Sequence, residues 1–222
     1  MEKINERLLN VDLKELKNIM EKQPKQPVCK LLYGPEGIGK SELIKSWVAE
    51  MDTNKLKDNK IFYFWLDLKE IKNTGMLGCW EIWKKLVSQF KESIPEEDYE
   101  DVADTVEEVY ELMENSIEEI LEDYDEDAKV CINELFEAFT EVDIHVKIIM
   151  THFEEVIRIF PKETDDGWFF MQLFDLSPKG SLIEKNLSIL LISACYPDSD
   201  MIHHMEYHSE FTDGYNVIYL GE

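Results

Sequence analysis

Gly34-Pro35-Glu36-Gly37-Ile38-Gly39-Lys40-Ser41 fits the pattern G-x-x-x-x-G-K-[ST] at every fixed position. An apolar run at 28–33 precedes this stretch, and an amphipathic segment at 41–51 follows it, so the order predicts a strand, a glycine-rich loop and a helix. Such a loop places backbone N–H groups around phosphates at a positive helix N-terminus, and its lysine neutralises phosphate charge. We therefore expect these eight residues to bind a nucleotide, with Ser41 as a ligand of Mg²⁺.

The composition limits the domain count and the location of the chain. A chain of 222 residues with 44% hydrophobic content is long enough for one α/β domain with an insertion. No run approaches the roughly 20 apolar residues of a membrane span, and the start of the chain lacks the basic-then-apolar order of a signal peptide. The sequence predicts a soluble, cytoplasmic protein without a membrane partner.

The net charge bears on the possible partners, and the cysteines bear on the redox state of the chain. The chain has 23 Lys and Arg against 48 Asp and Glu, a formal net charge of -25, so a phosphate backbone would repel it and nucleic acid is an unlikely partner. The four cysteines are scattered without a C-x-x-C pair, which favours buried, reduced thiols. They are Cys29, Cys79, Cys131 and Cys195.

Apolar runs alternate with amphipathic segments along most of the chain. The expected strands are 28–33, 61–67, 146–150, 187–193 and 216–220. The expected helices are 10–22, 41–51, 78–90, 132–139, 154–160 and 168–176. Strands that alternate with helices predict a mostly parallel sheet.

One segment differs from this alternation. Residues 92–128 contain no Lys or Arg, while apolar residues recur every three or four positions from Val102 to Tyr124. The pattern predicts an acidic helical insertion. It is either a solvated element whose apolar stripe packs on its own domain, or a docking surface for a basic or apolar protein partner.

The order of elements, together with the sequence Leu31 to Ser41, resembles the archaeal-type ATPases of the STAND group, which are relatives of AAA+ proteins. The resemblance implies a three-layer α/β fold of the additional-strand type, with strand order 5-1-4-3-2, that binds ATP and Mg²⁺. Such proteins normally continue into a helical lid and a winged-helix domain. Here we expect a single domain over 1–222, with 1–27 as N-terminal helix and linker, and no lid.

The resemblance also assigns roles at the ends of the strands. The Walker B strand of these proteins ends in an Asp-Glu pair, and the run 146–152 fills that slot with Thr151 and His152 in place of the two carboxylates. A rival alignment puts Walker B at 130–134. Ser193 stands at the sensor position near the γ-phosphate, and an arginine finger would be Arg158 or come from another protein.

Three carboxylates and a histidine pair are further candidates. Asp67 closes the second strand at the edge where ligands of open α/β sheets bind, and is a possible Mg²⁺ ligand. Glu154 and Glu155 could serve similarly, with Glu154 as the catalytic candidate beside Ser193. His204 and His208 have i, i+4 spacing, but no third ligand is fixed, which favours a surface segment over a metal site.

These residues predict an ATP-binding protein that acts as a nucleotide-dependent interaction module with weak or absent hydrolysis. A catalytically competent ATPase is the main alternative. A small P-loop kinase would need cationic residues in a lid, and this chain has two arginines in all, Arg7 and Arg158.

Overall fold

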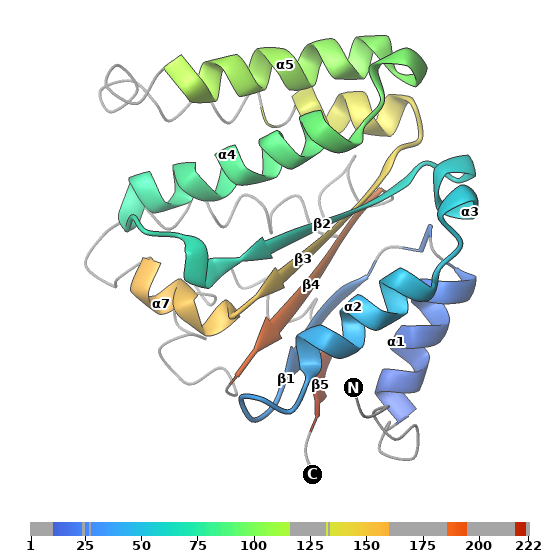
Figure 1. Cartoon of the computed structure of the whole chain (residues 1–222), viewed down its shortest axis with the longest axis vertical. Coiled ribbons are helices and arrows are strands. Elements are labelled where there is room, and N and C mark those ends of the chain that lie inside the picture. Colours follow the sequence, from blue (N-terminus) through green and yellow to red (C-terminus); the bar gives the residue numbers. More distant parts are fainter. Residues whose placement is uncertain are drawn as a thin grey trace.

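Five parallel strands form the centre of the structure, a computed structural model that describes residues 11–23, 25–26, 28–115, 132, 134–159, 186–194 and 216–220 (Figure 1). From one edge to the other they are β2 (Ile61–Asp67), β3 (His145–Thr151), β4 (Leu187–Ser193), β1 (Cys29–Tyr33) and β5 (Asn216–Tyr219). All four strand pairs are parallel. This is the predicted order 5-1-4-3-2, read from the opposite edge, and the α/β prediction is confirmed.

Side chains alternate between the two faces of the sheet, and each face has its own core. On β3 and β4, Ile148 and Ile189 belong to one core, whereas Ile149 and Leu190 belong to the other. Strands covered on both faces are apolar throughout, which explains the continuous apolar runs of the sequence. The sheet is therefore the middle of three layers.

In the described part of the chain, helices cover both faces of the sheet (Figure 1). The smaller core contains α1 (Val11–Lys22) and α2 (Lys40–Glu50). The larger core contains α4 (Gly75–Ser93), a helix at 134–141 and the short α7 (Val156–Ile159). A short helix that the sequence did not predict, α3 (Thr53–Asp58), lies between α2 and β2 and buries none of its residues.

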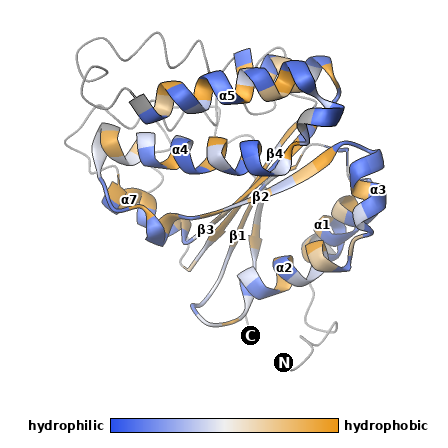
Figure 2. Ribbon diagram, turned by 45° about the horizontal axis from the view of Figure 1, so that its top comes forward, coloured by the Kyte–Doolittle hydropathy of each residue, from blue (hydrophilic) through white to orange (hydrophobic). Residues whose placement is uncertain are grey.

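The acidic insertion is helical as far as the structure describes it, over η3 (Glu96–Asp98) and α5 (Glu100–Asn115). Its stripe packs on the domain's own core, because Val102, Val106, Val109 and Met113 are each at most 3% exposed and join the cluster that contains α4. Figure 2 shows the hydrophobic and hydrophilic residues interleaved along α5. The first alternative for the stripe thus holds up to residue 113. Ile117, Ile120 and Tyr124 lie outside the described residues.

A buried lysine ties the segment after α1 to the sheet. Lys147, in the middle of β3, is 6% exposed, and its Nζ donates to the carbonyl of Gln26 at 3.0 Å and to Oγ of Ser188 at 2.7 Å. Lys25 also pairs with Asp143, two residues before β3 begins. The proline-rich segment that the sequence indicated as a linker is therefore anchored at residues 25–26.

Several sequence predictions fall outside the described residues. They include the helix at 168–176, the histidines 203, 204 and 208, and Arg7. Cys79 is a buried free thiol, as predicted. Within the described ranges, every helix is too short or too polar to span a membrane.

Candidate nucleotide-binding site

The glycine-rich loop connects β1 to α2 at the carboxyl edge of the sheet. Gly39 caps α2 with φ 91°, and Gly37 has φ 78°, two left-handed conformations that glycine adopts without a steric penalty. The N–H of Leu43 donates to the Gly39 carbonyl at 2.8 Å, which starts the helix directly after the loop. The loop therefore opens into the positive end of an 11-residue helix.

Lys40 is turned back onto this loop. Its side chain is buried, and Nζ donates to the carbonyls of Gly34 at 2.7 Å and Pro35 at 2.8 Å. A phosphate is a stronger acceptor for this ammonium than the two carbonyl oxygens, because it is charged. Ser41 follows in the first turn of α2, where its side chain is partly exposed.

Gly34 is required for a different reason: the backbone of Leu220, directly after β5, passes very close to it. The N–H of Leu220 donates to the Tyr33 carbonyl at 2.8 Å, and a Cβ at position 34 would lie 2.0 Å from the Leu220 carbonyl oxygen. Backbone atoms on both sides leave no room for that methyl group. The first glycine of the motif thus lets residue 220 pass beside the loop.

Gly34→Ala is expected to destabilise the protein by at least about 2 kcal/mol, since inserted atoms force backbone shifts. Urea unfolding followed by tryptophan fluorescence measures this loss. Gly37→Ala is the control, because nothing lies within 4 Å of its added Cβ and only the positive φ resists the change. Equal losses in the two variants would show that the contact with Leu220 is unimportant.

The strand register places the predicted site residues along one edge. Asp67 is aligned with Thr151, and Thr151 with Ile192, while Ser193 is aligned with Tyr33, which immediately precedes the loop. The ends of β2, β3 and β4 thus lead stepwise to the start of the glycine-rich loop. β3 ends at Thr151 and His152 follows it, whereas Ile132 and residues 134–141 are helical.

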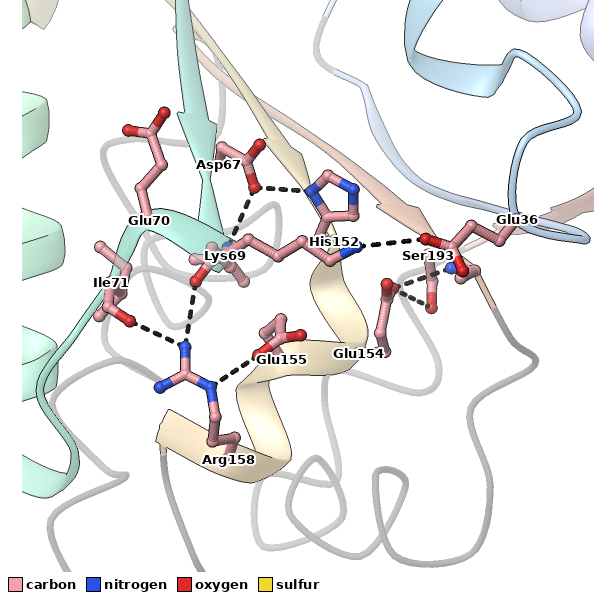
Figure 3. Close-up of polar contacts among 12 residues, drawn as sticks. Glu36, Asp67, Lys69, Glu70, Ile71, His152, Glu154, Glu155, Arg158 and Ser193 are labelled. Atoms are coloured by element: carbon pink, nitrogen blue, oxygen red, sulfur yellow. Dashed lines mark hydrogen bonds and ion pairs between the residues drawn. The ribbon is translucent and has the colours of Figure 1, made fainter.

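Glu154 and Ser193, the two catalytic candidates, are in contact (Figure 3). Oε2 of Glu154 accepts hydrogen bonds from the Ser193 hydroxyl at 3.2 Å and from the Ala194 N–H at 2.8 Å. Glu154 belongs to η4 (Phe153–Glu155), directly after β3. A carboxylate therefore lies beside Ser193, and it comes from the residues that follow β3.

Asp67 is engaged by two groups. Its Oδ1 lies 2.6 Å from Nδ1 of His152 and accepts the N–H of Lys69 at 3.0 Å, which caps η2 (Leu68–Glu70). His152 has a left-handed backbone with φ 54°, a conformation that is strained for a non-glycine residue. Asp67 therefore fixes both the His152 ring and the start of η2 in this structure.

Arg158 points away from the glycine-rich loop and holds η2 (Figure 3). Its Nη2 donates to the carbonyls of Ile71 at 2.8 Å and Leu68 at 3.4 Å, and its Nε lies 2.6 Å from Oε2 of Glu155. These contacts use the guanidinium to support the backbone after β2. They also engage Glu155, the remaining carboxylate candidate.

Sequence reasoning missed one residue at this edge. Lys69 reaches the glycine-rich loop, where its Nζ lies 3.3 Å from Oε1 of Glu36 (Figure 3). It is 33 positions from Glu36 in the sequence, and no motif relates the two. Lys69 could have been found from the position of Asp67 and the predicted strand order, because together they place the residues after β2 at the same edge of the sheet as the glycine-rich loop.

The profile of the ATPase domain found predominantly in Archaea matches residues 10–167 of the chain, which include the loop, β2 and the end of β3. This chain belongs to that ATPase family. Among curated protein sequences, none matches this ATPase domain.

Two solved structures of the ORC2 protein of Aeropyrum pernix resemble this ATPase domain in fold. One, with ADPNP and ADP, has a TM-score of 0.57 at 14% identity and covers 96% of this chain and 48% of its own. The other, the ADP form, has a TM-score of 0.56 at 13% identity and covers 93% of this chain and 45% of its own. This ATPase domain thus spans about half the length of the solved proteins that it matches.

Proposed function

We propose that this ATPase domain binds ATP with Mg²⁺ through residues 34–41 and uses the bound nucleotide to control an interaction, with slow hydrolysis. The supporting observation is the loop between β1 and α2, with Lys40 buried against the Gly34 and Pro35 carbonyls at the N-terminus of a helix. Titration of the purified chain with ATP measures this binding directly, and Lys40→Ala is the variant that should weaken it at least tenfold.

The residues around Ser41 fit a magnesium ion of the kind that accompanies a nucleotide. The Ser41 hydroxyl hydrogen-bonds no other described residue, and the Glu154 carboxylate lies beside Ser193, whose strand neighbours β1. Mg²⁺ in such sites takes one or two protein oxygens and completes its shell with phosphate oxygens and water. It therefore does not need a cluster of three ligands, and no such cluster exists among the described residues. When bound, the ion neutralises phosphate charge.

The residues at the end of β3 support the proposal of slow hydrolysis. Thr151, which is buried, and His152, which is hydrogen-bonded to Asp67, have no carboxylate with which to organise Mg²⁺ and orient water. The residues at this end of β3 support a Walker B strand that departs from the Asp-Glu pair of STAND ATPases. A chain that binds ATP but rarely hydrolyses it acts as a switch set by nucleotide concentration.

A competent ATPase remains the second candidate because of one contact. Glu154 is within hydrogen-bond distance of the Ser193 hydroxyl, so a carboxylate is present where one is needed, although it comes from a different position in the sequence. In that case Glu154 would orient the attacking water, and Glu154→Gln would abolish turnover without loss of ATP affinity.

We expect phosphate release by the purified chain to fall well below 1 per second, the lower end of the usual enzyme range. Thr151→Asp with His152→Glu, which installs the missing carboxylate pair, should raise the rate by about tenfold or more. Lys40→Ala in the same background is the control for a contaminating ATPase. A wild-type rate of several per second that is lost in Glu154→Gln would establish the competent ATPase instead.

The protein partner of such a switch would bind the acidic insertion, 92–128. The apolar side of α5 is buried in its own domain up to Met113, so what α5 offers outward is its charged side, with exposed Glu100, Asp101, Asp104, Glu108 and Glu111. A partner that docks there is a basic protein surface.

A further inference from the structure

A carboxylate is an unexpected group in a loop that binds phosphate. Glu36 occupies the third position of the glycine-rich loop and is exposed, with 77% of its side chain accessible. A negative charge there opposes the approach of another anion. The structure pairs this charge with Lys69, which lies in η2, directly after the edge strand β2.

The backbone of Lys69 is held in place on both sides, so the side chain alone is free to move. Its N–H donates to Asp67 at 3.0 Å, and Arg158 donates to the carbonyls of Leu68, the first residue of η2, and Ile71, which follows η2. η2 is thereby fixed at the edge where the Glu154 carboxylate and the loop also lie (Figure 3). The ammonium of Lys69 can exchange its acceptor without any change in the fold.

The ion pair between Lys69 and Glu36 is also weak enough for Lys69 to leave it for another anion. Both side chains are largely accessible, at 44% for Lys69 and 77% for Glu36, and exposed ion pairs contribute little free energy. The terminal phosphate of a nucleoside triphosphate carries more charge than a carboxylate and offers three oxygens. At the mouth of the loop, it is the stronger acceptor for an ammonium.

We infer that Lys69 is a terminal-phosphate sensor: it leaves Glu36 when a nucleoside triphosphate occupies the loop and binds the γ-phosphate, which a diphosphate lacks. This inference rests on the proposed nucleotide binding and deepens it. Lys69 supplies the cation for the γ-phosphate from η2. Arg158 does not provide this cation, because its guanidinium is bound to Glu155 and to the Ile71 carbonyl. Lys69 thereby distinguishes ATP from ADP.

The test is a pair of titrations, with ATP and with ADP, in Mg²⁺. Lys69→Gln should weaken ATP binding by about five- to tenfold and leave ADP binding within about twofold, as expected for the loss of one charge-assisted contact at an accessible site. Lys69→Arg should restore most of the ATP preference. Lys72→Gln is the matched control, since it removes the same charge from an exposed position three residues later and should affect neither nucleotide.

The inference would be overturned if Lys69→Gln weakened the binding of ATP and ADP equally. It would also be overturned if Lys69→Gln, like Lys72→Gln, affected the binding of neither nucleotide. If Lys69→Gln does not fold, Glu36→Gln decides: at least twofold tighter ATP binding supports it, and unchanged or weaker binding overturns it. Failure of the proposed function itself gives a different result, in which the wild-type chain binds neither nucleotide or Lys40→Ala binds as well as wild type.

Discussion

Replacing Val106 and Met113 by serine is expected to lower the free energy of unfolding by about 4 kcal/mol or more. Both side chains are at most 1% exposed and lie on the α5 stripe inside the larger core. The change removes their buried methyl and methylene groups, leaves cavities, and places two hydroxyl groups in an apolar environment. For a domain of ordinary stability this is a large part of the total, and urea unfolding monitored by circular dichroism measures it.

Asp104→Ser with Glu108→Ser on the same helix is the matched control, because both side chains are exposed and their loss should change stability by less than about 1 kcal/mol. The comparison separates the two interpretations of the acidic segment. If the variant with serine at both buried positions is as stable as wild type but loses a binding partner, the stripe is a docking surface. Burial of the stripe in the core would then not be what holds α5 in place.

Most of the fold could be predicted from local patterns. The second and fourth strands, Ile61–Asp67 and Leu187–Ser193, have the predicted bounds, because each is a mostly apolar run between polar segments. The glycine-rich motif fixed the first strand and the following helix to within one residue. The strand order came from the family resemblance, since local patterns do not determine which strands are neighbours.

What the sequence could not show are contacts between distant residues and elements without an apolar pattern. The helix α3 buries no side chain, so no periodicity marks it, although Asp52 caps it by accepting from the Asn54 and Lys55 N–H groups. Asp67 and His152 were separate candidates, 85 positions apart, until the parallel pairing of β2 and β3 brought their side chains within 2.6 Å.

Polar groups in strands were equally hard to interpret. Lys147 stands in an apolar run, where a charged residue usually faces solvent, yet it is buried and hydrogen-bonded to Gln26 and Ser188. Its acceptors lie 121 and 41 positions away, on the segment after α1 and on β4. Their presence depends on the packing of α1 against the sheet, which the sequence leaves open.

Lys40→Ala is expected to weaken ATP binding by about ten- to a hundredfold, the second large effect. A hydrogen bond between charged groups contributes about 1.5–3 kcal/mol, and each 1.4 kcal/mol is a factor of ten in affinity. Lys40 is buried at the mouth of the loop, with its Nζ on the Gly34 and Pro35 carbonyls, so water screens its charge less than that of a surface lysine.

The matched control is Lys57→Ala, which removes one positive charge from the exposed surface of α3 and should leave ATP affinity within about twofold. Thermal unfolding without nucleotide establishes that both variants are folded. A similar loss in both variants would mean that overall charge, and not the loop, governs binding.

Isothermal titration of ATP with Mg²⁺ into the wild-type chain, Lys40→Ala and Lys57→Ala tests most directly whether residues 34–41 form the nucleotide site. We predict one ATP bound per wild-type chain, the same for Lys57→Ala, and binding at least tenfold weaker for Lys40→Ala. ATP binding of equal strength in wild type and Lys40→Ala, or no binding by the folded wild-type chain, would contradict the account.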